Sequence, residues 1–130
     1  MSRRQLRVLV VEDEAMLRAL WTGLLTGAAF DVVGEAPDGA TALDLTSALC
    51  PDAMVVESHL PDFSGVEVIR RVRQELPRLI AVVVTSNPDV TNEVEATAAA
   101  FLKKGEGVGC LPLTLLELAE RHYPGQFGAG

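Results

Sequence analysis

The sequence is short of basic residues and contains no long apolar run. It has 11 Lys and Arg against 18 Asp and Glu among 130 residues, which gives a formal net charge of -7. Binding to nucleic acid or to an anionic membrane surface requires clustered positive charge, so we expect neither as a partner. No apolar run reaches the length of a membrane span, and the apolar stretch after the basic N-terminal residues is too short for a signal peptide. We therefore expect a cytoplasmic location.

Cysteine and histidine are also scarce. Cys50 and Cys110 lack the C-x-x-C spacing of metal and redox sites, and His59 and His122 are likewise far apart in the chain. These spacings favour two reduced, mostly buried thiols over a disulfide or a metal site. Apolar residues make up 48% of the chain, which is enough for one core, so we expect an ordered single domain.

Apolar patterning alternates between strand and helix along the chain. Apolar runs rich in Val, Leu and Ala predict strands at residues 6–11, 30–36, 53–56, 79–84 and 101–102. Helical spacing predicts helices at residues 16–27, 39–49, 64 to at least 72, 88–99 and 113–123. An N-cap at Asp38 and the capping box Ser64-x-x-Glu67 mark the starts of two of these helices.

Strand–helix alternation of this kind gives a parallel sheet with helices on both faces. The sequence therefore predicts a doubly wound α/β domain with a five-stranded parallel sheet, a flavodoxin-like α/β/α sandwich. We expect one domain at residues 1–123, followed by a flexible C-terminal tail at 124–130.

Charged and polar residues mark the carboxyl ends of four predicted strands. Glu12 and Asp13 follow the first strand, Glu57 ends the third, Thr85 ends the fourth and Lys104 follows the fifth. Singly, Thr85 could be a helix cap and Lys104 an ordinary surface lysine, but sites in open parallel sheets form at this edge. Carboxylates this close repel one another unless a cation or the lysine compensates, and hard oxygen ligands suit Mg²⁺.

Four motifs at these strand ends resemble the receiver domains of two-component response regulators. They are VLVVEDE at residues 8–14, DAMVVESHLPDFSG at 52–65, VVVTS at 82–86 and FLKK at 101–104. The resemblance covers about residues 6–123, and the combination of motifs is highly specific. It implies a domain of two-component phosphorelay signalling.

The resemblance also implies a role for each site residue. Glu57 stands at the phosphoacceptor position, where this family normally has aspartate. Glu12 and Asp13, together with the backbone carbonyl of His59, would hold Mg²⁺, and we expect this binding to be weak.

Three further positions would serve the phosphorylated state. Thr85 would bond a phosphoryl oxygen and report its presence, and Lys104 would pair with the acceptor and its phosphate. Phe101 stands at the aromatic switch position, although it has no hydroxyl to gain a hydrogen bond by rotating.

Glutamate at the acceptor position is the main departure from the family pattern. Its extra methylene moves the carboxylate roughly a bond length toward Thr85 and Lys104, and errors near 1 Å can cost about 10²-fold in a positioned reaction. We therefore predict a phosphorylation-independent receiver in which Glu57 is a built-in anion. It would not be an enzyme, and it would act by contact with a histidine kinase or downstream effector, or as a homodimer. The alternative is a conventional phospho-accepting receiver switch.

Two other classes share this topology. A flavodoxin-like cofactor protein would need a Ser-, Thr- or Gly-rich phosphate loop after the first strand, where Glu12-Asp13-Glu14 would repel phosphate. A phosphatase with an aspartyl nucleophile would need Asp-x-Asp at the same place. Both hypotheses fit the sequence less well.

Overall fold

Five parallel strands form the centre of the molecule. The computed structural model describes residues 4–86, 100–104 and 108–128. Neighbouring strands pair in parallel in the order β2-β1-β3-β4-β5, which confirms the predicted doubly wound sheet. The strands are β1 (Arg7–Val11), β2 (Asp31–Ala36), β3 (Ala53–Glu57), β4 (Ile80–Thr85) and β5 (Ala100–Lys103).

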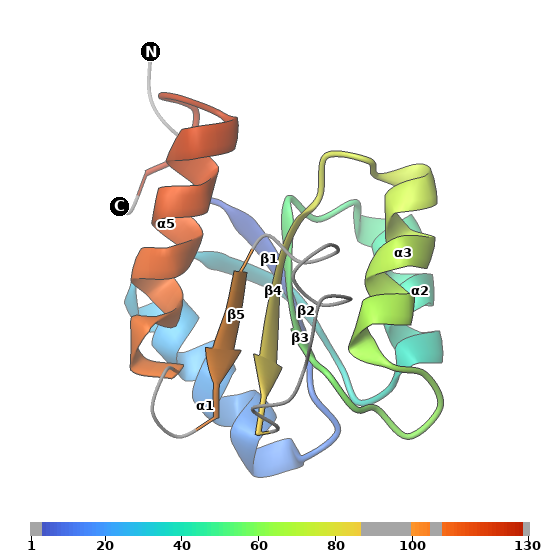
Figure 1. Cartoon of the computed structure of the whole chain (residues 1–130). Helices are drawn as coiled ribbons and strands as arrows, with labels where there is room; N and C mark the ends of the chain where they lie inside the picture. Colours follow the sequence, from blue (N-terminus) through green and yellow to red (C-terminus); the bar gives the residue numbers. More distant parts are fainter. Residues whose placement is uncertain (1–3, 87–99, 105–107, 129–130) are drawn as a thin grey trace.

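Helices cover both faces of this sheet (Figure 1). One face carries α1 (Ala15–Gly27) and α5 (Leu111–His122), and the other carries α2 (Gly39–Leu49) and α3 (Gly65–Glu75). A short 3₁₀ turn, η1 (Val108–Cys110), leads into α5. The helix expected at 88–99 lies outside the described residues. The layers are those of the predicted flavodoxin-like α/β/α sandwich.

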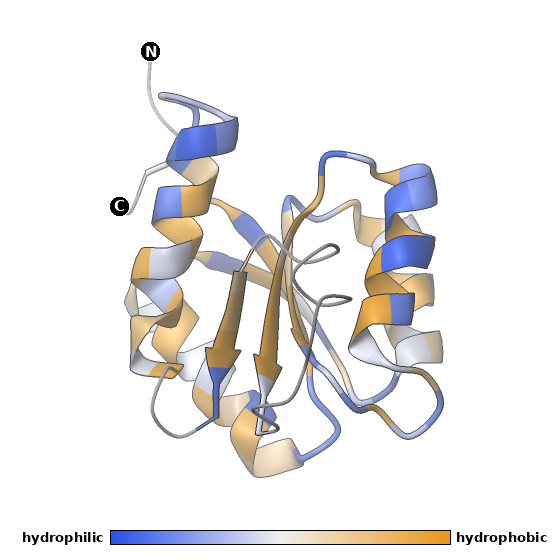
Figure 2. Cartoon of the chain, viewed as in Figure 1, coloured by the Kyte–Doolittle hydropathy of each residue, from blue (hydrophilic) through white to orange (hydrophobic). Residues whose placement is uncertain are grey.

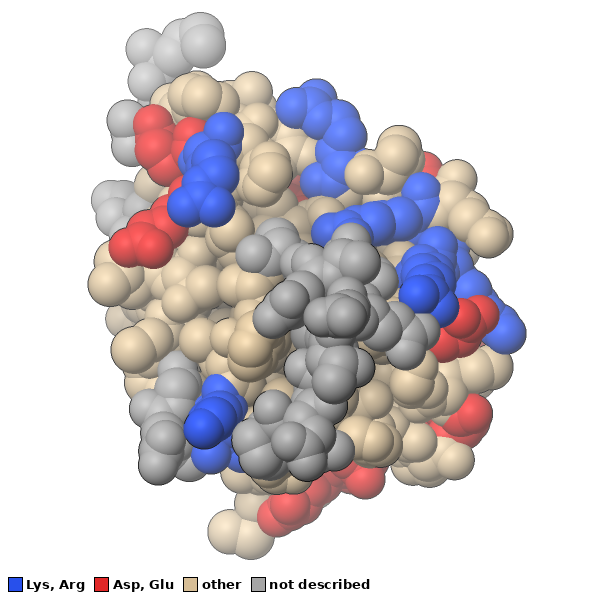
Figure 3. All heavy atoms as spheres, viewed as in Figure 1, with Lys and Arg blue, Asp and Glu red and all other residues tan. Residues whose placement is uncertain are grey.

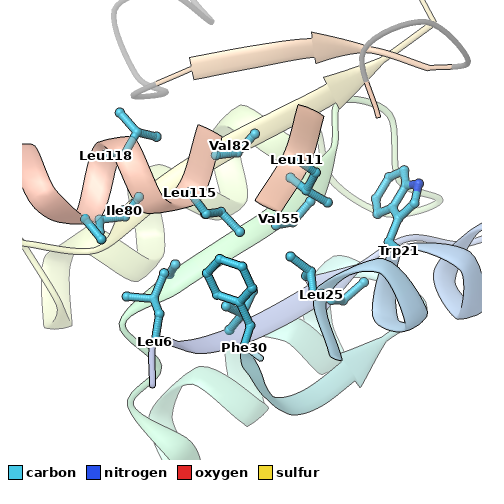
Figure 4. Close-up of a cluster of buried hydrophobic side chains, with 14 of the residues drawn as sticks. Leu6, Trp21, Leu25, Phe30, Val55, Ile80, Val82, Leu111, Leu115 and Leu118 are labelled. Carbon is cyan, nitrogen blue, oxygen red and sulfur yellow. The ribbon is translucent and has the colours of Figure 1, made fainter. Parts of the chain in front are cut away.

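Alternate residues of β1, β3 and β4 supply two separate cores. On β1, Val8 and Val10 belong to the cluster under α1 and α5, whereas Leu9 and Val11 belong to the cluster under α2 and α3. Figure 2 shows apolar colour running along the strands and on the inner sides of the helices. In the first cluster, aliphatic side chains surround Phe30 beside α1 (Figure 4). Because both faces of the sheet are covered, its strands are apolar along their length.

The helices begin where their capping residues predict. The Asp38 side chain accepts a hydrogen bond from the backbone N–H of Thr41 at 2.7 Å. The Ser64 hydroxyl accepts one from the backbone N–H of Glu67 at 3.1 Å, at the predicted capping box. The last helix starts two residues earlier than predicted, because Pro112 lies in its first turn, where a missing N–H costs nothing.

The segment after α5 is packed, and this differs from the expected flexible tail. Phe127 is 4% exposed and belongs to the core cluster under α1 and α5. Its ring meets that of Tyr123 edge to face, with centroids 5.6 Å apart, and the guanidinium of Arg4 lies 4.6 Å above it. Arg4 and Phe127 also form an isolated parallel bridge, which brings the two ends of the chain together. A domain ending at residue 123 would therefore omit a core side chain.

The expectation of mostly buried cysteines was wrong. Cys50 and Cys110 are both free and exposed. Both occupy helix ends: Cys50 is the C-cap of α2 in the left-handed conformation, and Cys110 precedes α5. Such positions project from the layers, so the apolar character of a thiol does not bury it there. Among the helices that the structure describes, none is long and apolar enough to cross a membrane.

Candidate functional site

The carboxyl ends of β1, β3, β4 and β5 meet at one edge of the sheet, the lower edge in Figure 1. The strand register pairs Val11 with Val56 and Glu57 with Val84. Residues that follow these strands are therefore neighbours, although they are far apart in the sequence. Acidic side chains gather at this edge in Figure 3. The strand ends therefore bring predicted site residues from four strands to the same edge.

One lysine lies between two buried carboxylates. The Lys104 ammonium forms an ion pair with Glu57 Oε2 and lies 3.4 Å from Glu12 Oε2. The side chains of Glu12 and Glu57 are 0% and 5% exposed, whereas that of Lys104 is 23% exposed. The backbone N–H of Lys104 donates to the carbonyl of Thr85 at 2.9 Å, which fixes the lysine beside the end of β4. Two buried carboxyl groups thus share one partly exposed lysine.

Burial and the shared ion pair change the pKa values of Glu12 and Lys104. Burial raises the pKa of Glu12 to about 7 against the lowering effects of the Glu14 backbone N–H and the Lys104 charge. Asp13 and Glu57 raise it further. For Lys104, burial alone would lower the pKa, but the hydrogen bonds and charges of Glu57 and Glu12 outweigh it and raise the pKa above its ordinary value.

A second network joins Glu57 to β4 through Ser58, a residue that the sequence prediction missed. Ser58 Oγ lies 3.0 Å from Glu57 Oε1 and 2.8 Å from Thr85 Oγ1. Ser58 and Thr85 are 5% and 1% exposed. The backbone N–H of His59 also donates to Glu57 Oε1, at 3.3 Å. The sequence shows a hydroxyl next to the acceptor position, but that placement assigns no role by itself.

The loop after β3 is held tightly around the acceptor position. A Cβ on Gly65 would lie 2.3 Å from the carbonyl oxygen of Glu57, so the start of α3 packs directly on the end of β3. Asp62 accepts hydrogen bonds from the backbone N–H groups of Gly39 and Ala40 at 2.8 and 2.9 Å, which ties the loop to α2. Burial would raise the pKa of Asp62, but these N–H groups lower it overall. The backbone around Glu57 is therefore fixed by the packing of α3 and by the hydrogen bonds of Asp62.

Three predicted site residues lie at the margin of this cluster. Asp13 and His59 are exposed beside Glu12 and Glu57, and Phe101 is 42% exposed on β5. Within the described ranges, no three His, Cys, Asp or Glu side chains form a metal-binding group. Glu12 and Asp13 supply the hard oxygen atoms that a Mg²⁺ ion prefers, but Lys104 already engages Glu12 Oε2.

Comparison with known proteins gives a consistent match. The response regulator receiver domain family matches residues 8–111. Protein-glutamate methylesterase/protein-glutamine glutaminase 3 of Anaeromyxobacter dehalogenans is 38% identical over 109 residues, which are 80% of this chain and 32% of that protein. Response regulator GacA of Pseudomonas aeruginosa is 33% identical over 107 residues, 79% of this chain and 50% of that protein. The chain spans half the length or less of these curated relatives.

Solved structures agree with the sequence matches. The signal receiver domain of the putative response regulator NarL from Mycobacterium tuberculosis has a TM-score of 0.81 and 27% identity, and the match covers 90% of this chain and 98% of that one. The response regulator domain of CheB from Thermotoga maritima shares the fold, with a TM-score of 0.74 at 23% identity over 92% of this chain and 97% of that one.

Proposed function

This chain belongs to the response regulator receiver domain family, and we propose that it is a receiver that signals without being phosphorylated. In this proposal Glu57 is a permanent anion at the position where the family normally carries its phosphoacceptor aspartate. The observation that supports it is the buried ion pair between Glu57 and Lys104. The lysine that would pair with a phosphorylated acceptor is already neutralised by the acceptor side chain itself.

The other contacts of Glu57 support the same reading. Its Oε1 atom accepts from the Ser58 hydroxyl and the His59 backbone N–H, and its Oε2 atom faces Lys104. Oε1 is thus held by two hydrogen-bond donors and Oε2 by the ion pair, and the side chain is 5% exposed. A nucleophile for phosphoryl transfer needs an accessible lone pair in line with the leaving group. Glu57 lacks this freedom, and its extra methylene carries the carboxylate past the position of an aspartate.

The output of such a receiver would be contact with another signalling protein. Receiver domains exchange signals with histidine kinases and effector domains, and we expect a partner of this kind, or a second copy of the chain. The domain would have no catalytic activity of its own. The methylesterase activity in the name of one relative is a property of that longer protein, of which this chain matches 32%.

A divalent cation would bind weakly in this proposal. Glu12 and Asp13, with the backbone carbonyl of His59, would hold it and neutralise charge beside Glu57. The Lys104 ammonium lies 3.4 Å from Glu12 Oε2 and would compete with the cation for that oxygen.

A conventional phospho-accepting receiver is the second candidate. It is favoured by the gathering of Glu12, Thr85 and Lys104 around the acceptor position. In this candidate Glu57 would accept phosphate despite its length, and Phe101 would respond to the movement of Thr85.

The reaction with acetyl phosphate and Mg²⁺ distinguishes the two candidates. Shortening the side chain in Glu57→Asp should withdraw the carboxylate from Lys104 and return it to a productive position. Intact-mass spectrometry should therefore detect a phosphate adduct on Glu57→Asp and none on the natural protein. Glu57→Asp combined with Asp13→Ala is the matched control, and it should lose the adduct. An adduct at Glu57 in the natural protein would overturn the proposal in favour of the conventional receiver.

A binding experiment tests the output directly. The purified natural protein and Glu57→Ala would be used as baits for the receiver's cognate proteins. Binding that requires the Glu57 anion and is unchanged by acetyl phosphate is the expected result. Equal capture by both baits would show that Glu57 does not set the binding state.

A further inference from the structure

Ser58 is a buried polar residue to which the receiver motif gave no role. It is 5% exposed and directly follows Glu57. Its backbone N–H donates to the carbonyl of Val84 at 3.1 Å, and its carbonyl accepts from the backbone N–H of Gly65 at 2.9 Å. The residue is therefore fixed on one side to β4 and on the other to the start of α3.

The Ser58 hydroxyl makes three polar contacts. Its Oγ atom lies 3.0 Å from Glu57 Oε1, 2.8 Å from Thr85 Oγ1 and 3.0 Å from Nδ1 of His59. A hydroxyl has one proton to donate and two lone pairs that accept. Three contacts therefore use its full capacity, and the direction of each hydrogen bond can be assigned.

The ion pair determines these directions. Glu57 is paired with Lys104, and a carboxylate can only accept, so the proton of Ser58 points to Glu57 Oε1. The distance to Thr85 Oγ1 would also let Ser58 donate to Thr85, but the single Ser58 proton cannot serve both partners. With that proton on Glu57, we infer that Thr85 and His59 donate to the two lone pairs of Ser58. The Thr85 hydroxyl proton is thus directed toward Ser58, and the imidazole of His59 carries a proton on Nδ1.

We propose that Ser58 is a positioning residue through which the Glu57 anion orients the Thr85 hydroxyl. This inference rests on the proposed function, because it treats Glu57 as the resident anion. Thr85 stands at the end of β4, where the family resemblance places the switch hydroxyl. Ser58 contacts both groups and joins the charge at the acceptor position to the residue that reports it. His59, exposed at the surface, completes the network from the solvent side.

The tautomer of His59 tests the hydrogen-bond directions without any mutation. We would record ¹⁵N NMR spectra of the imidazoles at about pH 8.5, where histidines are ordinarily neutral. His59 should be predominantly in the Nδ1–H form. His122, the other histidine in the chain, is an internal reference. A predominantly Nε2–H form of His59 would overturn the assignment, because Ser58 would then have to donate to His59 rather than to Glu57.

Removal of the hydroxyl tests the link itself. In Ser58→Ala, His59 should lose its preference for the Nδ1–H form, while His122 is unchanged. The matched control is Ser47→Ala, whose hydroxyl bonds Glu75 on the surface away from the site, and it should leave both histidines unaltered. A change that also appears in Ser47→Ala would indicate a general structural effect and contradict the proposal.

The response of Thr85 to Glu57 is the decisive readout. Glu57→Gln should shift the Thr85 methyl resonance when Ser58 is present. In the Ser58→Ala background the same substitution should shift it by at most about half as much, because residues that act through a contact have non-additive effects. Ser58→Thr, which keeps a hydroxyl, should restore the response. An equal Thr85 shift with and without the Ser58 hydroxyl would refute the link. The proposed function would survive that result, whereas a phosphate adduct on Glu57 would remove the function without moving this coupling.

Discussion

Replacing Lys104 by methionine removes the ammonium that faces the two buried carboxylates of the site. Methionine keeps most of the length and the apolar stem of the side chain, so the change isolates the charge. Glu12 and Glu57 would remain buried, at 0% and 5% exposure, without their shared cation. Breaking a buried ion pair in this way costs about 3–5 kcal/mol of stability. Because Lys104 is itself 23% exposed and water screens it in part, we expect the lower end, about 3 kcal/mol.

The deficit should depend on pH in a defined direction. Without Lys104, the pKa of Glu12 in the folded state rises further, because the lysine charge that lowers it is gone. A group whose folded pKa is raised stabilises the fold below its unfolded pKa, and that stability is lost as the pH rises through the folded pKa. The variant should therefore approach the stability of the natural protein as the pH falls toward the ordinary carboxyl value of about 4.5.

Urea unfolding provides the assay, with the fluorescence of the single tryptophan as the probe. Trp21 is fully buried, so its emission reports loss of the core. Lys103→Met, one residue earlier on the exposed side of β5, is the control and should change stability by less than about 0.5 kcal/mol. Equal unfolding midpoints for Lys104→Met and Lys103→Met at pH 7.5 would refute the reasoning, because they would mean that the ion pairs contribute nothing.

Three other perturbations test separate parts of the structure. Millimolar Mg²⁺ should raise the Tm of the natural protein slightly and leave that of Asp13→Ala unchanged; no response in either would speak against a cation site. Because the pKa of Glu12 is raised to about 7 in the folded state, this group contributes its full share to folding stability below pH 4.5. That contribution, at most roughly 3 kcal/mol, is lost as the pH rises through 7. Glu12→Gln should lack that part of the pH profile, and parallel profiles for the two proteins would contradict the shift. Phe127→Ala should lower the free energy of unfolding in urea by about 3–4 kcal/mol, whereas Phe101→Ala should lower it by less than about 1 kcal/mol. Similar losses in the two variants would show that Phe127 is not part of the core.

The fold could be predicted because each strand carries its own evidence. Strands covered on both faces must be apolar along their length, and this pattern is local. The end of the chain could not be predicted in the same way. Phe127 is the one large apolar side chain after Tyr123, and one of the residues that covers it, Arg4, lies at the other end of the sequence. Residues 124–130 are otherwise proline, glutamine, alanine and three glycines, which predict no core position.

The site could be predicted in part for the same reason. Glu12, Glu57 and Lys104 each follow a strand, and parallel strands bring their carboxyl ends to one edge. Ser58 could not be assigned, because its role comes from a contact across two strands, with Thr85, rather than from its position in a motif. Serine after a strand is common in loops, so its hydroxyl carries no signal until its neighbours are known.

The charge balance of the site determines what a metal response can show. Asp13 and Glu57 contribute two formal negative charges, and Glu12, whose pKa is raised to about 7, adds a partial one, against one positive charge from Lys104, so the site attracts cations even with the ion pair in place. The Lys104 ammonium lies closer to Glu57 than to Glu12. A cation that took Glu12 and Asp13 would therefore leave Lys104 with Glu57 and could even strengthen that pair by removing its competitor. Mg²⁺ binding is thus compatible with a phosphorylation-independent receiver as well as with a conventional one. Stabilisation by Mg²⁺ is therefore expected for both candidates, whereas a phosphate adduct at position 57 is expected only for the conventional receiver.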